Sequence, residues 1–379
     1  MSDPLNLLLD PRQSPTEFYA PRFEILVRNQ QLDPSTHGDI LSLKVDMDAD
    51  NLDRFDFTVN NWDDRTLDFK YSDSDTFDVN TPVKVSIGYA DRLVTIMHGA
   101  IESLTPSFPE SGSPTLAVAG TNSLNRLRGR KAGPNEQKKF ENMREFEIVQ
   151  IVAARNGLTP RCDEDQHLND IIWQRDLDDA MFLMERARRI DFDLYVQTDP
   201  STSEDCLYFV NPKDKRGSGP VRSYVFEWGK SLMSFSPKLN ASRQVGKVTV
   251  RGWNPATKEP FVATATAASL PQTSSGGKSG PDVAGNKGDE VVDSLVTSQT
   301  EAQRIADSIL TEKAYDFITG EGRVIGLADL RPGDVVELKG LGTRFSGDYH
   351  LRRVSHSVGA DGFTTTFGAR RLFDGGLKT

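Results

Sequence analysis

Apolar and polar residues alternate with a period of two along the first part of the chain. Six runs between about Arg22 and Gly120 show this alternation, and they begin at Phe23, Asp39, Arg54, Thr81, Arg92 and Pro114. The runs are bounded by Asp, Asn, Gly and Pro, which favour turns. The pattern is typical of half-buried antiparallel strands. Six such strands are enough for a small sandwich or barrel.

The middle of the chain changes to a helical period. The stretch REFEIVQIVAARNG spaces Ile148, Ile151 and Val152 as on one helix face, and Gly157 follows as a C-terminal cap. The stretch DLDDAMFLMERARRI predicts a second helix, with acidic residues at its start and arginines at its end, as the helix dipole favours. FDLYVQ and CLYFVNP then predict a hairpin. This region is therefore expected to be an α+β insert.

The last part returns to strands. VGKVTVRGW from Val245 and PFVATATA from Pro260 alternate cleanly, and residues from about 269 to 290 are rich in Ser, Gly and Pro, which predicts a flexible loop. Ser298 and Glu301 have the spacing of a capping box and predict the start of a further helix. Two more strands follow Arg331, with Val335, Leu338 and Leu351 as expected core positions, and GFTTTFGARRL closes the region.

The first and last regions echo each other. The segment from Thr81 to Gly120 predicts a strand, a turn, a strand entering through Gly99, a loop and a last strand. The segment from Arg331 repeats that order and enters through Gly347. This indicates two related modules in one chain.

Composition limits the function classes. The chain has 379 residues, of which 37% are apolar and 26% charged, and this suggests two or three soluble domains. A net charge of −10 argues against a general nucleic-acid binder. The short basic cluster of Arg126, Arg128, Arg130 and Lys131 is expected to be a solvated face. The N-terminal stretch MSDPLNLLLDPRQ has neither a signal-peptide nor a membrane-anchor pattern.

No chemical motif is complete. Cys162 and Cys206 are too few for a zinc site and do not suggest a disulfide framework. GGKS, which ends at Ser279, lacks the earlier glycine of a phosphate loop, since Gln272 stands there. DMDADN from Asp46 lacks the glycine and the glutamate of a calcium loop, because Asn51 and Phe57 occupy those places.

Two histidines near the C-terminus are the remaining candidates for chemistry. His350 and His356 lie near Asp348, and their even spacing would place both on one strand face. No third ligand or nucleophile accompanies them, so we expect structural histidines. No pair among the 55 carboxylates stands out as a glycosidase acid and base. We therefore assign no catalytic, cofactor-binding or metal-binding residue and expect no cofactor.

Three stretches together resemble one family. They are GAIESLTPSFPESGSPTLAVAGTNSLNRLRG from Gly99, the pair EFEIVQIVAARNGL and WQRDLDDAMFLMERARRIDFDLYVQ, and the C-terminal run from Glu321 to Leu372. In this order they resemble the phage late control gene D proteins, which are baseplate hubs of contractile tails, and the hub part of the VgrG proteins of type VI secretion. The sequence stops soon after Leu372, so the fused spike of some family members is not expected, and a separate spike protein is.

The resemblance implies an α+β, mainly β fold with two related antiparallel β-barrel tube domains and an α+β insert between them. The expected boundaries are 1–21 for an N-terminal extension, 22–131 and 237–379 for the two barrels, and 132–236 for the insert. The implied function is a non-enzymatic structural hub. Its trimer would adapt a sixfold inner tube to a threefold spike, because three chains with two modules each give six similar units.

The implied partners are copies of the chain, a spike, inner tube or tube-initiator proteins and baseplate wedge proteins, without nucleic acid or a membrane anchor. The implied site of assembly is the bacterial cytoplasm, within a phage virion or a phage-tail-like particle. Two alternatives remain open. One is a tail-associated cell-wall hydrolase with a carbohydrate-binding insert, and the other is a carbohydrate- or protein-binding β module of an unrelated secreted system.

Overall fold

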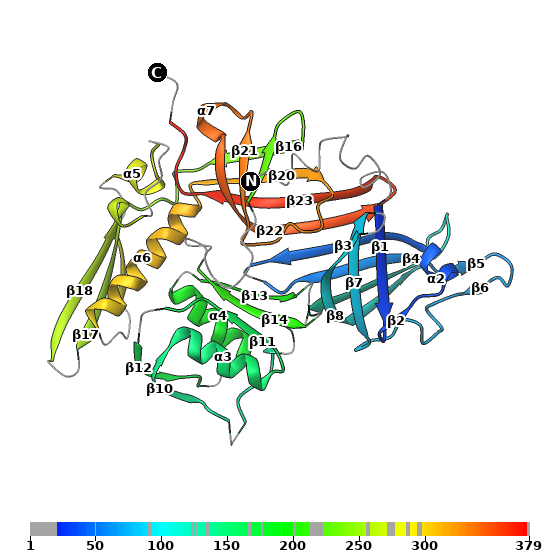
Figure 1. Ribbon diagram of the computed structural model, residues 1–379, viewed down its shortest axis with the longest axis horizontal. Coiled ribbons are helices and arrows are strands. Elements are labelled where there is room, and N and C mark those ends of the chain that lie inside the picture. Colours follow the sequence, from blue (N-terminus) through cyan, green and yellow to red (C-terminus); the bar gives the residue numbers. More distant parts are fainter. Residues whose placement is uncertain are drawn as a thin grey trace.

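In the computed structural model, one large sheet forms the body of the molecule (Figure 1). The described residues are 21–376 without 50, 90–91, 123–124, 126, 134–135, 166–167, 176, 191, 200–201, 203, 212–222, 255–257, 271–276, 286–288 and 294–297. The neighbouring strands of the large sheet follow the order β16-β20-β23-β22-β3-β4-β9-β8-β7-β1-β2, and β15 and β21 extend it beside β22.

The first module of the sheet comes from the N-terminal region. Its strands are β1 (Pro21–Val27), β2 (Gln30–Gln31), β3 (Ile40–Asp48), β4 (Arg54–Asn60), β7 (Pro82–Tyr89), β8 (Arg92–Ser107) and β9 (Thr115–Asn122). The short helix α2 (Pro34–Gly38) and the hairpin of β5 (Trp62–Asp63) and β6 (Asp68–Phe69) lie in its connections. Alternate residues such as Val45, Phe57 and Val118 are buried, as the period of two predicted.

The second module comes from the last third of the chain. Its strands are β15 (Ser223–Glu227), β16 (Leu232–Leu239), β20 (Ile318–Ile325), β21 (Val335–Lys339), β22 (Gly347–Gly359) and β23 (Gly362–Arg371), with the single turn α7 (Gly342–Phe345). The two modules share one apolar core. The ring of Tyr89 in the first module packs at a tilt against Phe363 of the second, with the ring centroids 5.4 Å apart, and its hydroxyl donates a hydrogen bond to the carbonyl oxygen of Gly326.

The two modules join edge to edge through β3 and β22. Arg353 to Val358 of β22 pair antiparallel with Asp48 to Leu43 of β3, and His356 lies opposite Val45. The hydrogen bond from the Ala49 N–H to the Arg352 carbonyl extends the pair by one step. Through this joint the strands of the two modules form one continuous sheet.

The echo seen in the sequence is an internal repeat of strand register. β16-β20-β23-β22 corresponds to β3-β4-β9-β8, and both sets have their two irregularities at matching places. One lies between Leu232 and Ser234 in β16 and between Ile40 and Ser42 in β3. The other lies between Leu351 and Arg353 in β22 and between Ile101 and Ser103 in β8.

Backbone hydrogen bonds repeat as well. Leu351 exchanges bonds with Gly333 and Asp334 just as Ile101 does with Asn80 and Thr81. In this register the residue of the second module that is equivalent to Gly99 is Tyr349 and not Gly347. The sequence echo was therefore two residues out of register at its glycines.

The middle region has its own core below the large sheet (Figure 1). It contains α3 (Glu145–Arg155) and α4 (Asp179–Arg189), the pair β10 (Lys139–Arg144) and β12 (Leu168–Trp173), and the sheet β11 (Thr159–Cys162), β14 (Asp205–Val210) and β13 (Asp193–Thr198). Gly157 has a φ of +72° after α3, which a glycine adopts without strain, so it ends the helix as predicted. The expected fold class, mainly β with an α+β insert, is confirmed.

A third layer departs from the sequence analysis. β17 (Lys247–Asn254), β18 (Glu259–Thr266) and β19 (Asp289–Asp293) form a separate sheet, and α6 (Gln299–Tyr315) covers it with Ala302, Ala306 and Leu310. The Ser298 side chain caps this helix by accepting from the Glu301 N–H. The strands from Val245 and Pro260 were expected in the second barrel but lie outside the large sheet, because their apolar face packs on the helix. The large sheet instead includes β15 and β16 from Ser223 onward. The expected domain boundaries themselves stay predictions.

Two further expectations are wrong. Within the stretch 269–290, α5 (Gly280–Ala284) begins at Ser279, which is fully buried, and Gly277 touches the carbonyl of Asp374, so this part is packed. Residues 271–276 and 286–288 lie outside the described residues, as do the N-terminal residues 1–20 and Arg126.

In β21, Val336 and Leu338 are fully buried while Val335 is only half-buried, because the strand places odd positions on the other face. No helix among the described residues is long and apolar enough to cross a membrane.

Candidate functional site

A polar face extends across the joint between the two modules. It contains the side chains that alternate with the core positions of β16, β20, β23, β22, β3 and β4. A groove of about 840 Å³ lies over it, and its polar lining consists of Lys44, Asp46, Asp48, Asn51, Arg54, Ser234, Ser236, Glu321, Arg323, Arg353, Ser355 and Thr366. Hydroxyl groups and charges of both signs share this face, which can therefore contact polar partners.

Charges on the polar face are partly paired. Lys44 binds Asp46 at 2.6 Å, and Arg353 binds Glu321 at 3.3 Å. Such exposed pairs contribute about 0–1 kcal/mol each to stability. Arg54 and Arg323 form no ion pair within the described part of the chain, so this surface keeps positive charge available for a partner.

The large sheet ends on strand edges that have no partner within the described residues. β16 pairs with β20 along one edge. The Asn240 N–H donates to the Phe317 carbonyl on that side, so the backbone groups of Phe235, Pro237 and Leu239 face the open side. Met233, at the irregularity of this strand, is 53% exposed. Open strand edges are the usual places where another chain pairs.

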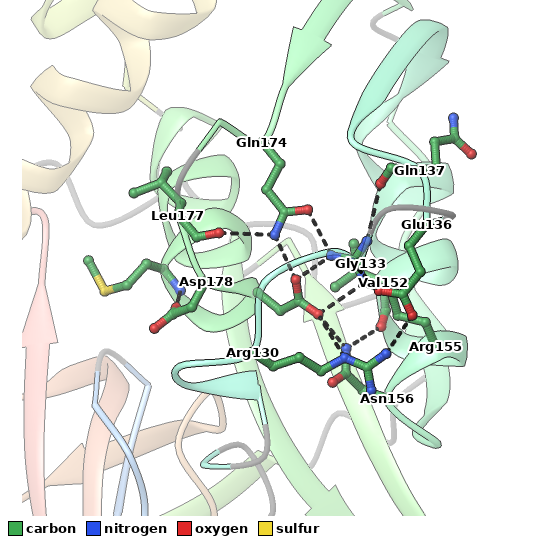
Figure 2. Close-up of polar contacts among 12 residues, drawn as sticks. Arg130, Gly133, Glu136, Gln137, Val152, Arg155, Asn156, Gln174, Leu177 and Asp178 are labelled. Atoms are coloured by element: carbon green, nitrogen blue, oxygen red, sulfur yellow. Dashed lines mark hydrogen bonds and ion pairs between the residues drawn. The ribbon is translucent and has the colours of Figure 1, made fainter.

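The most concentrated polar cluster lies in the insert, around Asp179 at the first turn of α4. This carboxylate is fully buried. It accepts hydrogen bonds from Arg155 Nε at 3.0 Å, Gln174 Nε2 at 2.6 Å and Asn156 Nδ2 at 2.7 Å. Arg130 Nε lies 3.9 Å away. Figure 2 shows how the labelled Arg155, Asn156 and Gln174 converge there from α3 and from the segment after β12.

The arrangement of this cluster is structural. Both carboxylate oxygens of Asp179 accept at least two hydrogen bonds, and Arg155 also binds Gln174 Oε1 at 2.8 Å. A carboxylate saturated in this way has no lone pair directed at a substrate. Its position at the start of α4 also favours negative charge, because the helix dipole is positive there. The cluster therefore holds α3, α4 and the preceding loops together.

A second set of ion pairs links the insert to α6. Arg189 at the end of α4 binds Glu301, and Arg304 binds Asp165 at 3.4 Å. Behind them, Glu145 and Arg186 form a fully buried pair with Nε to Oε2 at 2.8 Å. Burial raises the pKa of Asp165 to about 6, and the nearby Glu145 adds to this while Arg304 opposes it. These ion pairs hold the insert against α6 of the third layer.

His356 is fully buried in the core of the second module. Nδ1 lies 3.0 Å from Thr365 Oγ1, and Nε2 lies 3.2 Å from the Leu330 carbonyl oxygen. Burial and the nearby Arg331 guanidinium lower its pKa to about 3. The ring is therefore neutral at pH 7 and serves as a structural hydrogen-bonding group.

His350 does not share a face with His356. The irregularity between Leu351 and Arg353 shifts the alternation by one residue, so His350 points away from the core that holds His356. Its ring packs edge-on against Tyr315 of α6 at 5.4 Å. The even spacing in the sequence misled because a bulge is invisible to a period-two pattern. Within the described residues, no group of three or more His, Cys, Asp or Glu is placed to hold a metal ion.

Solved structures share this fold. The 43 kDa tail protein of prophage MuSo2 from Shewanella oneidensis superimposes with a TM-score of 0.69 at 13% identity, over 93% of this chain and 98% of that one. The tail protein from Neisseria meningitidis MC58 does so with a TM-score of 0.66 at 14% identity, over 93% and 97%. The E. coli c3393 protein matches with a TM-score of 0.57 at 14% identity, over 91% and 76%, and is described as a type VI secretion component similar to the T4 tail proteins gp27 and gp5.

These structures define the class: the chain has the fold of phage tail proteins, and the resemblance to tail hub proteins is confirmed at the level of fold. The chain belongs to the family described as the Alg8 N-terminal domain, which matches residues 19–360. No curated protein matches the sequence.

Sequence reasoning missed the Asp179 cluster. Its members come from positions 130, 155, 156, 174 and 179, and they meet only when α3, α4 and their loops pack. The one local signal was the acidic start of the second predicted helix, which was attributed to the helix dipole alone. The open strand edges had no local signal, since they depend on which strands remain unpaired.

Proposed function

We propose that the chain is a structural hub of a contractile injection particle or phage tail. It would form a trimeric ring that adapts a sixfold inner tube to a threefold spike. The observation that carries this proposal is the internal repeat: two modules with matching strand register and matching irregularities lie side by side in one chain. Three copies of such a chain supply six nearly equivalent modules, which is the geometry that a sixfold tube requires.

The shared fold supports the proposal. Two of the structures named above are tail proteins and a third is a component of type VI secretion. Their likeness extends over at least 91% of this chain, so it includes both modules and the insert. A tube on one side, a spike on the other and baseplate wedge proteins around the ring are the partners that this role requires.

We also propose that the chain is not an enzyme. The two most deeply buried carboxylates of the insert, Asp179 and Glu145, are bound by arginines and amides rather than directed into the groove. His356 is inside the core. Purified protein should therefore release no soluble fragments from peptidoglycan.

The deciding experiment is an electron cryo-microscopy reconstruction of the particle that contains this chain. We expect three copies in one ring at the tube end, with the two modules of each copy alternating around the axis. Six copies in the ring, or a single copy on the particle surface, would contradict the proposal.

A further inference from the structure

Two strand edges correspond to the two sides of the β3–β22 joint, one on β8 and one on β16, and both are open within the described residues. β22 pairs with two strands along one edge: Gly347–His350 with β21, and Arg353–Val358 with β3. β8 is its counterpart in the first module. Arg92–Ala100 of β8 pair with β7, but Ser103–Ser107 have no partner on that edge within the described residues. The place that β3 occupies on β22 is thus open on β8.

The strand that would fill this place is β16. It is the counterpart of β3, since the irregularity at Met233 corresponds to the one at Leu41. These two residues are exposed to nearly the same degree, 53% and 52%. β3 uses its second edge to bind β22, whereas the second edge of β16 has no partner in the described part of the chain beyond Leu232, which forms an isolated bridge with Trp228.

Apolar side chains support the correspondence. Within the chain, Val354 and Val358 of β22 are buried beside Met47 and Leu43 of β3. Their counterparts at the open edge of β8 are Leu104, which is half-buried, and Phe108, which is 59% exposed. Leu239 and Phe235, the counterparts of Met47 and Leu43, are half-buried. A strand added in the same register would cover these four apolar residues.

We propose that β16 of one copy pairs antiparallel with Ser103–Ser107 of β8 in the next copy, in the register of the β3–β22 joint. This inference rests on the proposed ring and specifies the contact that closes it. Opposed residues are Ser103 and Asn240, Leu104 and Leu239, Thr105 and Lys238, Pro106 and Pro237, and Ser107 and Ser236, with Phe108 facing Phe235. The contact joins different surfaces of the two copies, so it is head-to-tail and closes a ring when the rotation fits.

Two prolines set the strength of this contact. Pro106 and Pro237 take the places of His356 and Val45, which face each other inside the chain. Pro237 faces the open edge, and a proline there offers no N–H to a new neighbour. The central pair therefore exchanges no hydrogen bond, while the next hydrogen-bonded positions, Leu104 with Leu239 and Phe108 with Phe235, can. Prolines at an edge limit unspecific strand addition, so the contact between copies forms less readily than the one within the chain.

Disulfide trapping tests the register. Thr105 and Lys238 are exposed, and they would form a non-hydrogen-bonded pair, with Cα atoms about 4.5 Å apart, which a disulfide spans. In particles assembled from the Thr105→Cys, Lys238→Cys double variant, we expect covalent trimers on a non-reducing gel. Mixed particles from the two single variants should give dimers at most. The matched control is Ser355→Cys, Asp46→Cys, which is the equivalent pair inside the chain and should link within a monomer.

The inference is overturned if the control pair links while the double variant stays monomeric in assembled particles. If the double variant does not assemble, a reconstruction of the unmodified particle shows whether these two strands are neighbours, and any other neighbour overturns the inference. A ring of three copies joined through other strands would refute only this contact. A particle without such a ring would refute the proposed function itself.

Discussion

The imidazole of His356 in β22 donates and accepts hydrogen bonds within the core, and its partner Thr365 lies directly opposite it in β23. Thr365 Oγ1 accepts from the Leu327 N–H at 2.9 Å and lies 3.0 Å from Nδ1 of the histidine. Nε2 lies 3.2 Å from the Leu330 carbonyl oxygen and 3.3 Å from Arg331 Nη1. These contacts hold the segment 327–331 against β22 and β23 of the second module.

Replacing this histidine should change how stability depends on pH. The pKa of His356 is lowered from 6.5 to about 3 by burial, so the unfolded chain binds a proton between these values and the folded chain does not. The stability that the neutral ring contributes is therefore complete above pH 6.5 and is lost as the pH falls toward 3. His356→Gln should reduce the difference in unfolding free energy between pH 7.5 and pH 5 by about 2 kcal/mol.

Urea unfolding at the two pH values measures this difference. The matched control is Thr365→Val, which removes a hydrogen bond but leaves the histidine in place. It should cost about 1–3 kcal/mol at both pH values and keep the pH dependence. If His356→Gln and the unmodified protein lose the same stability on acidification, then His356 is not the group responsible.

Asp179 should be the most costly polar residue of the insert to neutralise. Asp179→Asn preserves the volume but leaves the Arg155 side chain, which is only 9% exposed, without its buried counter-ion. Breaking a buried pair in this way typically costs about 3–5 kcal/mol. Glu136→Gln is the control, because its pair with Arg130 is about one-third exposed and such pairs contribute about 0–1 kcal/mol. Equal losses of melting temperature in the two variants would contradict the structural role given to Asp179.

Local patterns predicted the elements well, because each one depends on residues near in sequence. Alternation in VKVSIGY gave β7, and Ser298 with Glu301 gave the start of α6. Non-local packing was out of reach. The sheet of β17, β18 and β19 alternates like the strands of the large sheet, and only its burial against α6 separates it from them.

The candidate site shows the same limit. A single extra residue in β22 reverses the face of every later side chain, so His350 and His356 separate although their spacing is even. The sequence did not show that His356 is fully buried and hydrogen-bonded, whereas His350 lies on the other face. The polar face could not be predicted either, because it forms only where β3 pairs with β22, which lies about 300 residues later in the sequence.

The face of β21 can be checked by a pair of truncations. Leu338 is fully buried in the shared core, whereas Val335 is half-buried on the opposite face. Leu338→Ala should cost about 2–5 kcal/mol of unfolding free energy and reduce the yield of assembled particles. Val335→Ala should cost about 1 kcal/mol or less. Chemical denaturation of the isolated chain measures the loss of unfolding free energy for both variants. A larger loss for Val335→Ala would contradict the assignment of Leu338 to the core face of β21.

The prolines of the open edges should keep the isolated chain from associating. Pro237→Val restores an N–H that faces the open side of β16, and valine already occupies the equivalent position 45 in the β3–β22 joint. One added hydrogen bond of about 0.5–1.5 kcal/mol should tighten self-association about two- to tenfold. Sedimentation velocity over a range of concentrations measures it. Ser236→Val is the control, because the backbone of residue 236 faces β20 and offers the open edge nothing new. If Ser236→Val associates as strongly as Pro237→Val, added hydrophobicity rather than the restored donor is the cause, and the prolines do not guard the edge.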